Sequence, residues 1–101
     1  MPTALSNPQK RYLRGLAHDL KPVVLVGAKG VTEALLAELN GALEQHELIK
    51  VRIAAEDRET RDQWISDLAE GSQAALVGRI GHVGVFYRPR KDKPLVILPK
   101  A

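Results

Sequence analysis

Hydrophobic residues recur along the chain at helical and strand spacings, and the changes of spacing predict its secondary structure. Ser6 and Gln9 match the capping-box pattern, which predicts a first helix over about Asn7 to Leu20. The apolar residues on one face of that helix are Leu13, Leu16, Ala17 and Leu20. Pro22 disfavours helix at the residue before it, so the run from Val23 to Val26 predicts a buried strand.

The middle of the chain predicts a second helix, a strand and a third helix. Thr32 is a good N-cap for an amphipathic helix with an acidic outer face that ends near His46. From Leu48 to Ile53 apolar and polar residues alternate, which predicts a strand with a cationic side formed by Lys50 and Arg52. Asp57 can cap a third helix and Gly71 can end it. The residues of that helix spaced to pack inward are Trp64, Ile65 and Leu68.

The remaining residues predict a hairpin and a tail. Strands are expected over Ala74 to Ile80 and Val83 to Arg88, and they should pair antiparallel around Gly81-His82 with a positive φ at Gly81. Residues from about 90 onward fit either an added edge strand or a loosely docked tail. The order α-β-α-β-α-β-β predicts an α/β fold with two layers and a mixed four-stranded sheet. With 101 residues, 45% of them hydrophobic, residues 1–101 should form a single domain around one core.

Composition excludes several classes of function. The chain has no cysteine, which excludes disulfides, zinc ribbons and thiol nucleophiles. No apolar run approaches the roughly 20 residues that span a bilayer, and no secretory signal is apparent, so a cytoplasmic protein without membrane contact is expected. His18, His46 and His82 are scattered, and no nucleotide-binding glycine motif occurs, so we expect no metal, no cofactor and no small-molecule substrate.

Charge is strongly segregated along the chain. Residues 1–30 carry five Lys/Arg against one Asp, a net of +4, and residues 72–101 carry six against one Asp, a net of +5. Residues 31–71 carry four against ten acidic residues, a net of −6. If the two basic ends meet in space, they form one positive surface that would attract a polyanion.

Two features of the basic amino-terminal part suit a nucleic-acid backbone. A basic stripe borders the apolar face of the first helix, formed by Lys10, Arg11, Arg14, His18 and Lys21. Between the first strand and the second helix lies a G-x-x-G loop, Gly27-Ala28-Lys29-Gly30, where glycines allow close backbone approach and the helix N-terminus offers free N–H groups. A tight β-to-α turn would explain the two glycines equally well. Lys50, Arg52, Arg88 and Arg90 are candidates for additional RNA contacts.

Other candidate groups have structural explanations. The carboxylates of Glu56, Asp57, Glu59 and Asp62 begin a helix, where they oppose the macrodipole. Phe86 and Tyr87 lie on opposite faces of the last strand, so at most one can stack on a base. His46 at a helix end suggests a cap or core role, and His82 fits the hairpin turn.

Several ordered segments together resemble one family. They are Leu16-Ala17-His18, Leu20-Lys21-Pro22-Val23-Val24, Val26-Gly27 to Gly30, Thr32-Glu33, His46-Glu47-Leu48-Ile49-Lys50-Val51-Arg52, Ile80-Gly81-His82 and Tyr87-Arg88-Pro89. With them the chain resembles the CRM (chloroplast RNA splicing and ribosome maturation) domain in its stand-alone bacterial YhbY form. The resemblance implies a fold similar to the C-terminal domain of bacterial translation initiation factor three, with a KH-like loop. It places RNA contacts on residues 27–30 and on the basic stripe. In plants, domains of this family act in group II intron splicing.

The leading hypothesis is therefore a monomeric, non-enzymatic RNA-binding protein that associates with ribosomal RNA in precursors of the large ribosomal subunit. A rival is a protein-interaction module whose acidic middle segment binds a basic ribosomal protein. A hydrolase with an unrecognised site is a third alternative, for which no catalytic residue can be named.

Overall fold

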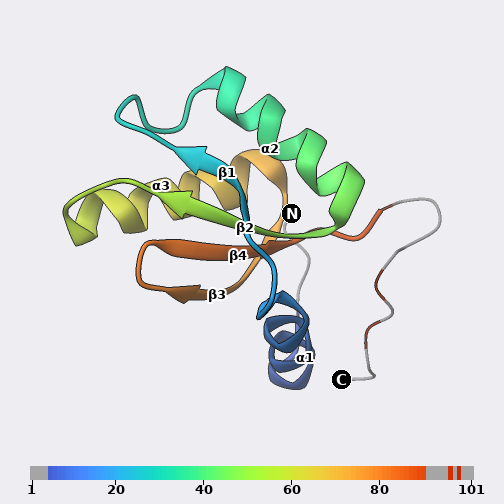
Figure 1. The fold of residues 1–101 in the computed structure, drawn as a ribbon. Coiled ribbons are helices and arrows are strands. Elements are labelled where there is room, and N and C mark those ends of the chain that lie inside the picture. Colours follow the sequence, from blue (N-terminus) through green and yellow to red (C-terminus); the bar gives the residue numbers. More distant parts are fainter. Residues whose placement is uncertain (1–4, 91–95, 97, 99–101) are drawn as a thin grey trace.

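The elements follow one another in the predicted order α-β-α-β-α-β-β over the part of the chain that the computed structural model describes, residues 5–90, 96 and 98 (Figure 1). The helices are α1 (Asn7–Ala17), α2 (Glu33–His46) and α3 (Arg58–Ser72). The strands are β1 (Pro22–Val26), β2 (Leu48–Ile53), β3 (Ala75–Ile80) and β4 (Val83–Tyr87).

Side-chain caps define the start of every helix, as the sequence predicts. Ser6 Oγ accepts from the Gln9 backbone N–H at 3.3 Å, and Gln9 Oε1 accepts from the Ser6 N–H at 3.0 Å. Thr32 caps α2, and Asp57 caps α3. These caps satisfy backbone N–H groups that have no partner within their helix, which is why the starts were predictable from local sequence.

Two helix ends differ from expectation. Helix α1 ends at Ala17, three residues before Leu20, whose N–H donates to the Ala17 carbonyl in a tight turn. Helix α3 continues through Gly71 to Ser72, and Gln73 ends it with a left-handed φ of 61°. Gly71 instead lies against α2, because a β-carbon there would approach Leu36 Cδ2 to 2.7 Å.

The strands form one mixed sheet in the order β1-β2-β4-β3. Strand β1 runs parallel to β2, while β4 runs antiparallel to both β2 and β3. Gly81 has a φ of 57° in the β3–β4 turn, so the hairpin prediction is confirmed. Because of these strand directions, the carboxyl ends of β1 and β2 and the β3–β4 turn lie at the same end of the sheet.

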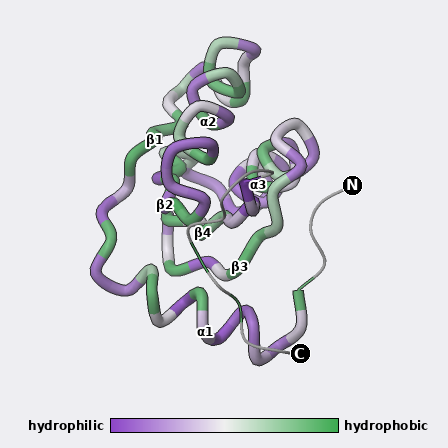
Figure 2. Tube along the Cα trace, turned by 90° about the vertical axis from the view of Figure 1, so that its right-hand side faces the viewer, coloured by the Kyte–Doolittle hydropathy of each residue, from purple (hydrophilic) through white to green (hydrophobic). Residues whose placement is uncertain are grey.

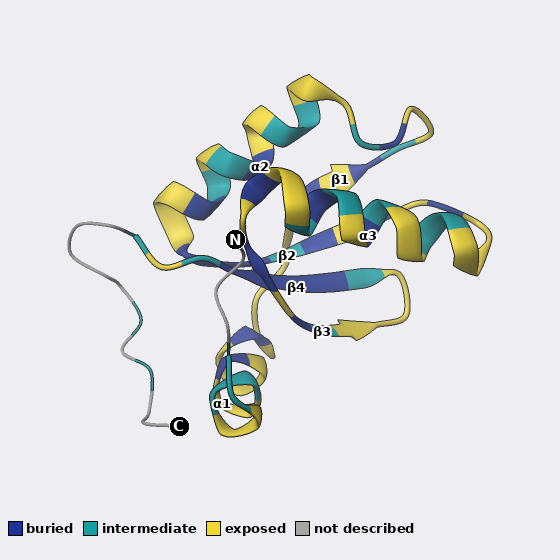
Figure 3. Ribbon diagram, turned by 180° about the vertical axis from the view of Figure 1, so that it is seen from behind, coloured by how far each residue is buried: buried dark blue, intermediate teal, exposed yellow. Residues whose placement is uncertain are grey.

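Both faces of the sheet carry a core cluster, so the two-layer expectation needs correction. Helices α2 and α3 cover one face, around Leu39, Leu43, Ile65, Leu68 and Phe86. Helix α1 lies beneath the other face (Figure 2), where Leu13 and Ala17 pack on Val77, Val85 and Tyr87. Figure 3 shows the buried strand residues between these layers. Helix α1 thus adds a partial third layer.

Strand β1 is buried on one face only, whereas its continuous apolar run predicted a fully buried strand. Val24 and Val26 are buried towards α2 and α3, but Val23 and Leu25 are 51% and 57% exposed. The reason is that α1 covers β3, β4 and the start of β2, and leaves β1 uncovered at the edge of the sheet. The same offset leaves Leu16 and Leu20, expected to pack inward, 44% and 41% exposed.

The buried Glu47 connects the last part of the chain to the start of β2. It has a φ of 61°, and its carboxylate accepts hydrogen bonds from the N–H of Arg90 at 2.6 Å and of Val96 at 2.7 Å. Val96 and Leu98 pack against the α1 side of the sheet. Most of the predicted tail lies outside the described residues. In the part of the chain that is described, no helix is long and apolar enough to cross a membrane.

Candidate nucleic-acid interface

The amino-terminal and carboxyl-terminal segments of the chain meet on the α1 side of the sheet. Helix α1 comes from the amino-terminal segment and packs on β3 and β4, which come from the carboxyl-terminal segment. Helices α2 and α3, which carry most of the acidic middle segment, lie on the opposite face. The cations on the α1 side therefore come from α1 and β2, because Arg79 and Arg88 of the carboxyl-terminal segment pair with Asp62 of α3 and Glu44 of α2.

The basic stripe is held against the sheet at two points. Arg14 Nη1 donates to the Val77 carbonyl at 3.2 Å, and its side chain passes over Gly78, where a β-carbon would come within 2.9 Å of Arg14 Cδ. Lys50 Nζ donates to the His18 carbonyl at 3.2 Å, which joins β2 to the end of α1. Arg11 and Lys21 are exposed, while Lys10 is half-buried. The structure therefore brings Arg14, His18 and Lys50 together.

A strip of sheet beyond α1 remains open to solvent. The strand registers pair Leu25 with Arg52, Arg52 with Val83, and Val83 with Ile80. Paired residues share a face, so these four form one row across the sheet. Ile80 is 70% exposed and Leu25 57% exposed, with the exposed Arg52 between them in the row. This row combines a cation with apolar groups, a composition that suits a nucleic-acid strand with exposed bases.

The G-x-x-G loop follows β1 directly, at the end of this strip, and its two glycines are not equivalent. Gly30 is buried with a φ of 72°, its N–H donates to the Gly27 carbonyl at 3.0 Å, and a β-carbon on it would lie 3.0 Å from Trp64 Cε2. A β-carbon on Gly27 would meet nothing within 4 Å. Ala28 and Lys29 are exposed between them. The positive φ and the contact with Trp64 explain why residue 30 is a glycine, whereas the free space beside Gly27 is available to a ligand.

Two of the additional candidates lie away from this strip. Arg88 donates to Asn40 Oδ1 and to the Ser72 carbonyl, both at 2.7 Å, and pairs with Glu44 at 3.0 Å. Arg90 follows it at the opposite end of β4 from the hairpin turn, with its N–H on Glu47. Arg88 therefore links α2, α3 and β4, and we assign it a structural role.

The acidic residues at the start of α3 are also engaged structurally. The hydrogen bond from the Thr60 backbone N–H lowers the pKa of Asp57, which caps the helix. The hydrogen bond from Arg79 lowers the pKa of Asp62 and ties α3 to β3. Within residues 5–90, 96 and 98, no group of three His, Asp or Glu side chains is placed to hold a metal ion.

Of the remaining predictions for aromatic residues and histidines, some are correct and others are wrong. Phe86 and Tyr87 lie on opposite faces as expected, but both are buried, so neither can stack on a base. Burial, and then the nearby Glu47, raise the pKa of Tyr87. His82 lies in the hairpin turn, 3.4 Å from Arg61 Nη1. His46 is exposed rather than part of the core.

Sequence reasoning missed two features of this region. One is the exposure of Val23 and Leu25, which no local signal marks because they are as apolar as the buried Val24 and Val26. The other is the role of Glu47 in holding the N–H groups of Arg90 and Val96. No local pattern marks Glu47, because its partners are more than 40 residues away.

Comparison with known proteins gives a consistent set of relatives. The model of the CRS1 / YhbY (CRM) domain matches residues 5–88. A Haemophilus influenzae protein named RNA-binding protein is 50% identical over 90 residues, covering 89% of this chain and 91% of that protein. A Pseudomonas aeruginosa protein named as a probable RNA-binding protein is 42% identical over 94 residues, covering 91% and 90%. The solution structure of a Staphylococcus aureus protein suggested to bind RNA is similar, with a TM-score of 0.82, 34% identity and coverage of 95% and 100%.

Proposed function

The chain belongs to the CRS1 / YhbY (CRM) domain family, and we propose that it is a non-enzymatic RNA-binding protein. Its RNA in this proposal is ribosomal RNA within precursors of the large ribosomal subunit, whose assembly it assists in the cytoplasm. The names of its relatives support RNA binding in general. The choice of ribosomal RNA extends the family resemblance carried by the sequence motifs.

One observation carries the proposal: cationic side chains from distant parts of the chain gather beside an uncovered strip of sheet. Lys50 Nζ donates to the backbone carbonyl of His18 beside the stripe residue Arg14, and Arg52 lies two residues further along β2 on the same face. Residues 27–30 continue this surface at the end of β1. Cations spaced in this way can follow successive phosphates, and the apolar row offers surface to bases.

In this proposal the loop approaches the sugar-phosphate backbone. The free space at Gly27 allows close contact, Lys29 supplies a cation, and the N-terminus of α2 adds its partial positive charge. This arrangement resembles the way in which KH-type loops bind a sugar-phosphate backbone.

The rival protein-interaction module has less support from the acidic face. Glu44 pairs with Arg88, Asp62 pairs with Arg79, and Asp57 caps α3. These carboxylates are partly neutralised within the molecule and are therefore less available to a basic partner.

Crosslinking in cells, followed by sequencing of the attached RNA, tests the proposal. We expect the reads to concentrate on the RNA of the large subunit, and the protein to sediment with large-subunit precursors and to leave them at high salt. Reads spread over messenger RNA, or sedimentation as free protein only, would contradict the ribosomal assignment. Sedimentation that resists salt and does not require RNA would favour the protein-interaction module.

A further inference from the structure

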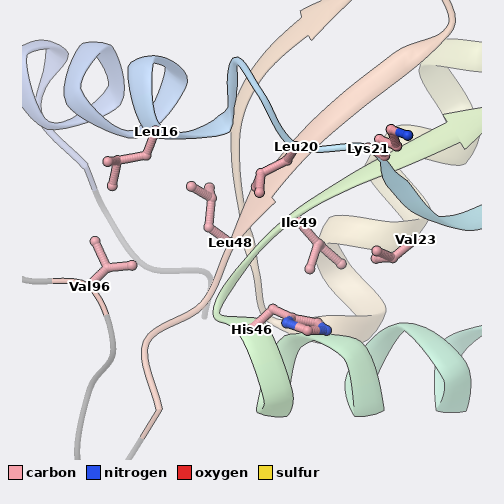
Figure 4. Close-up of a pocket in the computed structure, with 8 residues that line it drawn as sticks. All are labelled: Leu16, Leu20, Lys21, Val23, His46, Leu48, Ile49 and Val96. Carbon is pink, nitrogen blue, oxygen red and sulfur yellow. The ribbon is translucent and has the colours of Figure 1, made fainter.

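An apolar groove lies beside the end of α1. It occupies about 410 Å³ between α1, the start of β1 and the end of α2 (Figure 4). No segment of the sequence predicted it, because its lining comes from separate parts of the chain. The size is in the range of pockets that hold small organic groups.

The lining of the groove is almost entirely apolar. Leu48 and Ile49 are buried and form its floor. Leu16, Leu20 and Val23 also line it, and their side chains are exposed. The groove accounts for the exposure of these three apolar residues. An apolar floor with open apolar walls can take a flat group with hydrophobic faces.

One end of the groove is held in place by the buried glutamate. Val96 lines this end, and its N–H donates to Glu47 Oε1 at 2.7 Å. In Figure 4 Val96 and Leu16 lie at the same end of the groove. This end of the lining is therefore anchored to the fold.

Two polar side chains line the groove. His46, exposed in the last turn of α2, and Leu20 lie on opposite sides of Ile49 (Figure 4). Lys21 also lines the groove and belongs to the basic stripe. The imidazole offers an aromatic face, and the ammonium group can bind a phosphate next to whatever enters.

We propose that this groove binds one unstacked nucleobase of the bound RNA, with Lys21 on an adjacent phosphate. The proposal rests on the proposed function and adds the class of RNA: one with an unpaired base that can leave the stack. Proteins bind such bases between apolar and aromatic side chains, histidine included. The groove is continuous with the RNA surface, because Val23 belongs both to the groove and to the exposed face of β1.

Charge favours this occupant over a peptide from a basic ribosomal protein. Such a peptide would meet Lys21 and the basic stripe and would be repelled. RNA meets the same cations favourably, and its base supplies the flat hydrophobic group.

The test compares two RNA hairpins that differ in a single base. Both have the same stem and one bulged nucleotide, which is 2-aminopurine in one RNA and an abasic residue in the other. The two carry the same number of phosphates, so electrostatic attraction is matched. We expect the wild-type protein to bind the RNA with the base about tenfold more tightly, in line with base stacking on side chains. The 2-aminopurine fluorescence should change on binding.

Two groove variants and one control assign the preference to the groove. Leu20→Asn and His46→Ala should each reduce the preference while leaving affinity for the abasic RNA unchanged, because neither removes a basic stripe residue. Leu76→Asn is the matched control: it makes the same substitution at a leucine of similar exposure, 36% against 41%, on β3 outside both the groove and the apolar row, and should keep the preference. His46→Ala changes an exposed side chain, so it remains informative if Leu20→Asn destabilises the fold.

Equal affinity of the wild-type protein for the two RNAs would overturn the groove proposal and would leave the groove to an apolar peptide or to a second copy. A base preference that persists in both groove variants would overturn it too. Either result is compatible with the proposed function, provided that both RNAs bind with a steep salt dependence. Failure of both RNAs to bind at low salt would instead count against the proposed function.

Discussion

The indole of Trp64 in α3 lies against Gly30, so close that a β-carbon at residue 30 would stand 3.0 Å from Trp64 Cε2. Gly30 also has a φ of 72°, which L-residues adopt at a cost. We therefore expect Gly30→Ala to lower the free energy of unfolding by about 1 to 2 kcal/mol. Urea denaturation measures this change.

Gly27→Ala is the matched substitution at the other end of the loop and should separate binding from stability. Its β-carbon has open space, so the free energy of unfolding should change by less than about 0.5 kcal/mol. RNA affinity should fall, because the added methyl group occupies the space proposed for the sugar-phosphate backbone. If Gly27→Ala binds RNA as wild type does, Gly27 has no role in close approach.

Arg52 tests the cationic part of the sheet strip. Arg52→Gln removes one exposed cation from the centre of the row and should weaken RNA binding, with a plot of log affinity against log salt shallower by about 0.7 to 1. Ala37→Glu changes net charge by the same amount on the exposed side of α2 and should leave the slope close to wild type. Equal effects of the two substitutions on RNA affinity would mean that binding depends on net charge and not on the position of Arg52.

Arg88 should prove structural. Its guanidinium group bonds Asn40, Ser72 and Glu44, so Arg88→Ala leaves partly buried acceptors without a donor. We expect the free energy of unfolding to fall by about 2 kcal/mol. RNA affinity, corrected for the folded fraction, should stay close to wild type. If Arg88→Ala is stable but binds RNA weakly, Arg88 belongs to the RNA interface and the structural assignment is wrong.

Acid should weaken the contact between α3 and β3. Arg79 lowers the pKa of Asp62 below the usual 3.8 of an aspartate, so the charged form is favoured in the folded state. A group of this kind stabilises the fold above its unfolded pKa, and the contribution is lost as pH falls through the lower folded pKa. Stability should therefore decrease below about pH 4. Unfolding measured from pH 7 to pH 2 should show a shallower decrease for Asp62→Asn than for wild type or for the exposed control Glu38→Gln.

Local signals predicted the fold well because they act within a few residues. The capping residues Ser6, Thr32 and Asp57 each bond an N–H three residues ahead, and all three helix starts were correct. The turn at Gly81 needs a positive φ, which glycine provides without strain. Gly71 misled the prediction because its lack of a side chain serves contact with Leu36, and a close helix contact leaves no local pattern.

The site was predictable only in part, because its boundaries depend on packing between distant segments. Arg52 and Arg88 are both basic residues near strand ends, and only the tertiary contacts of Arg88 with Asn40 and Ser72 separate their roles. The apolar run of β1 gives no sign that α1 would cover other strands and leave Leu25 exposed. The position of residues 27–30 at the end of β1 did follow from the sequence, because the loop adjoins that strand directly.

The strand order has a consequence for how the chain folds while it is being synthesised. Strand β4 is synthesised after β1, β2 and β3, yet it lies between β2 and β3 and, within the described residues, is the only strand that pairs with β3. Its Phe86 and Tyr87 complete the core clusters on the two faces of the sheet. A nascent chain that has reached Ile80 therefore has an unpaired β3 and two unfinished cores. Stable folding must therefore wait until residue 87 is free to pair, so the two cores of this domain are completed in the same step.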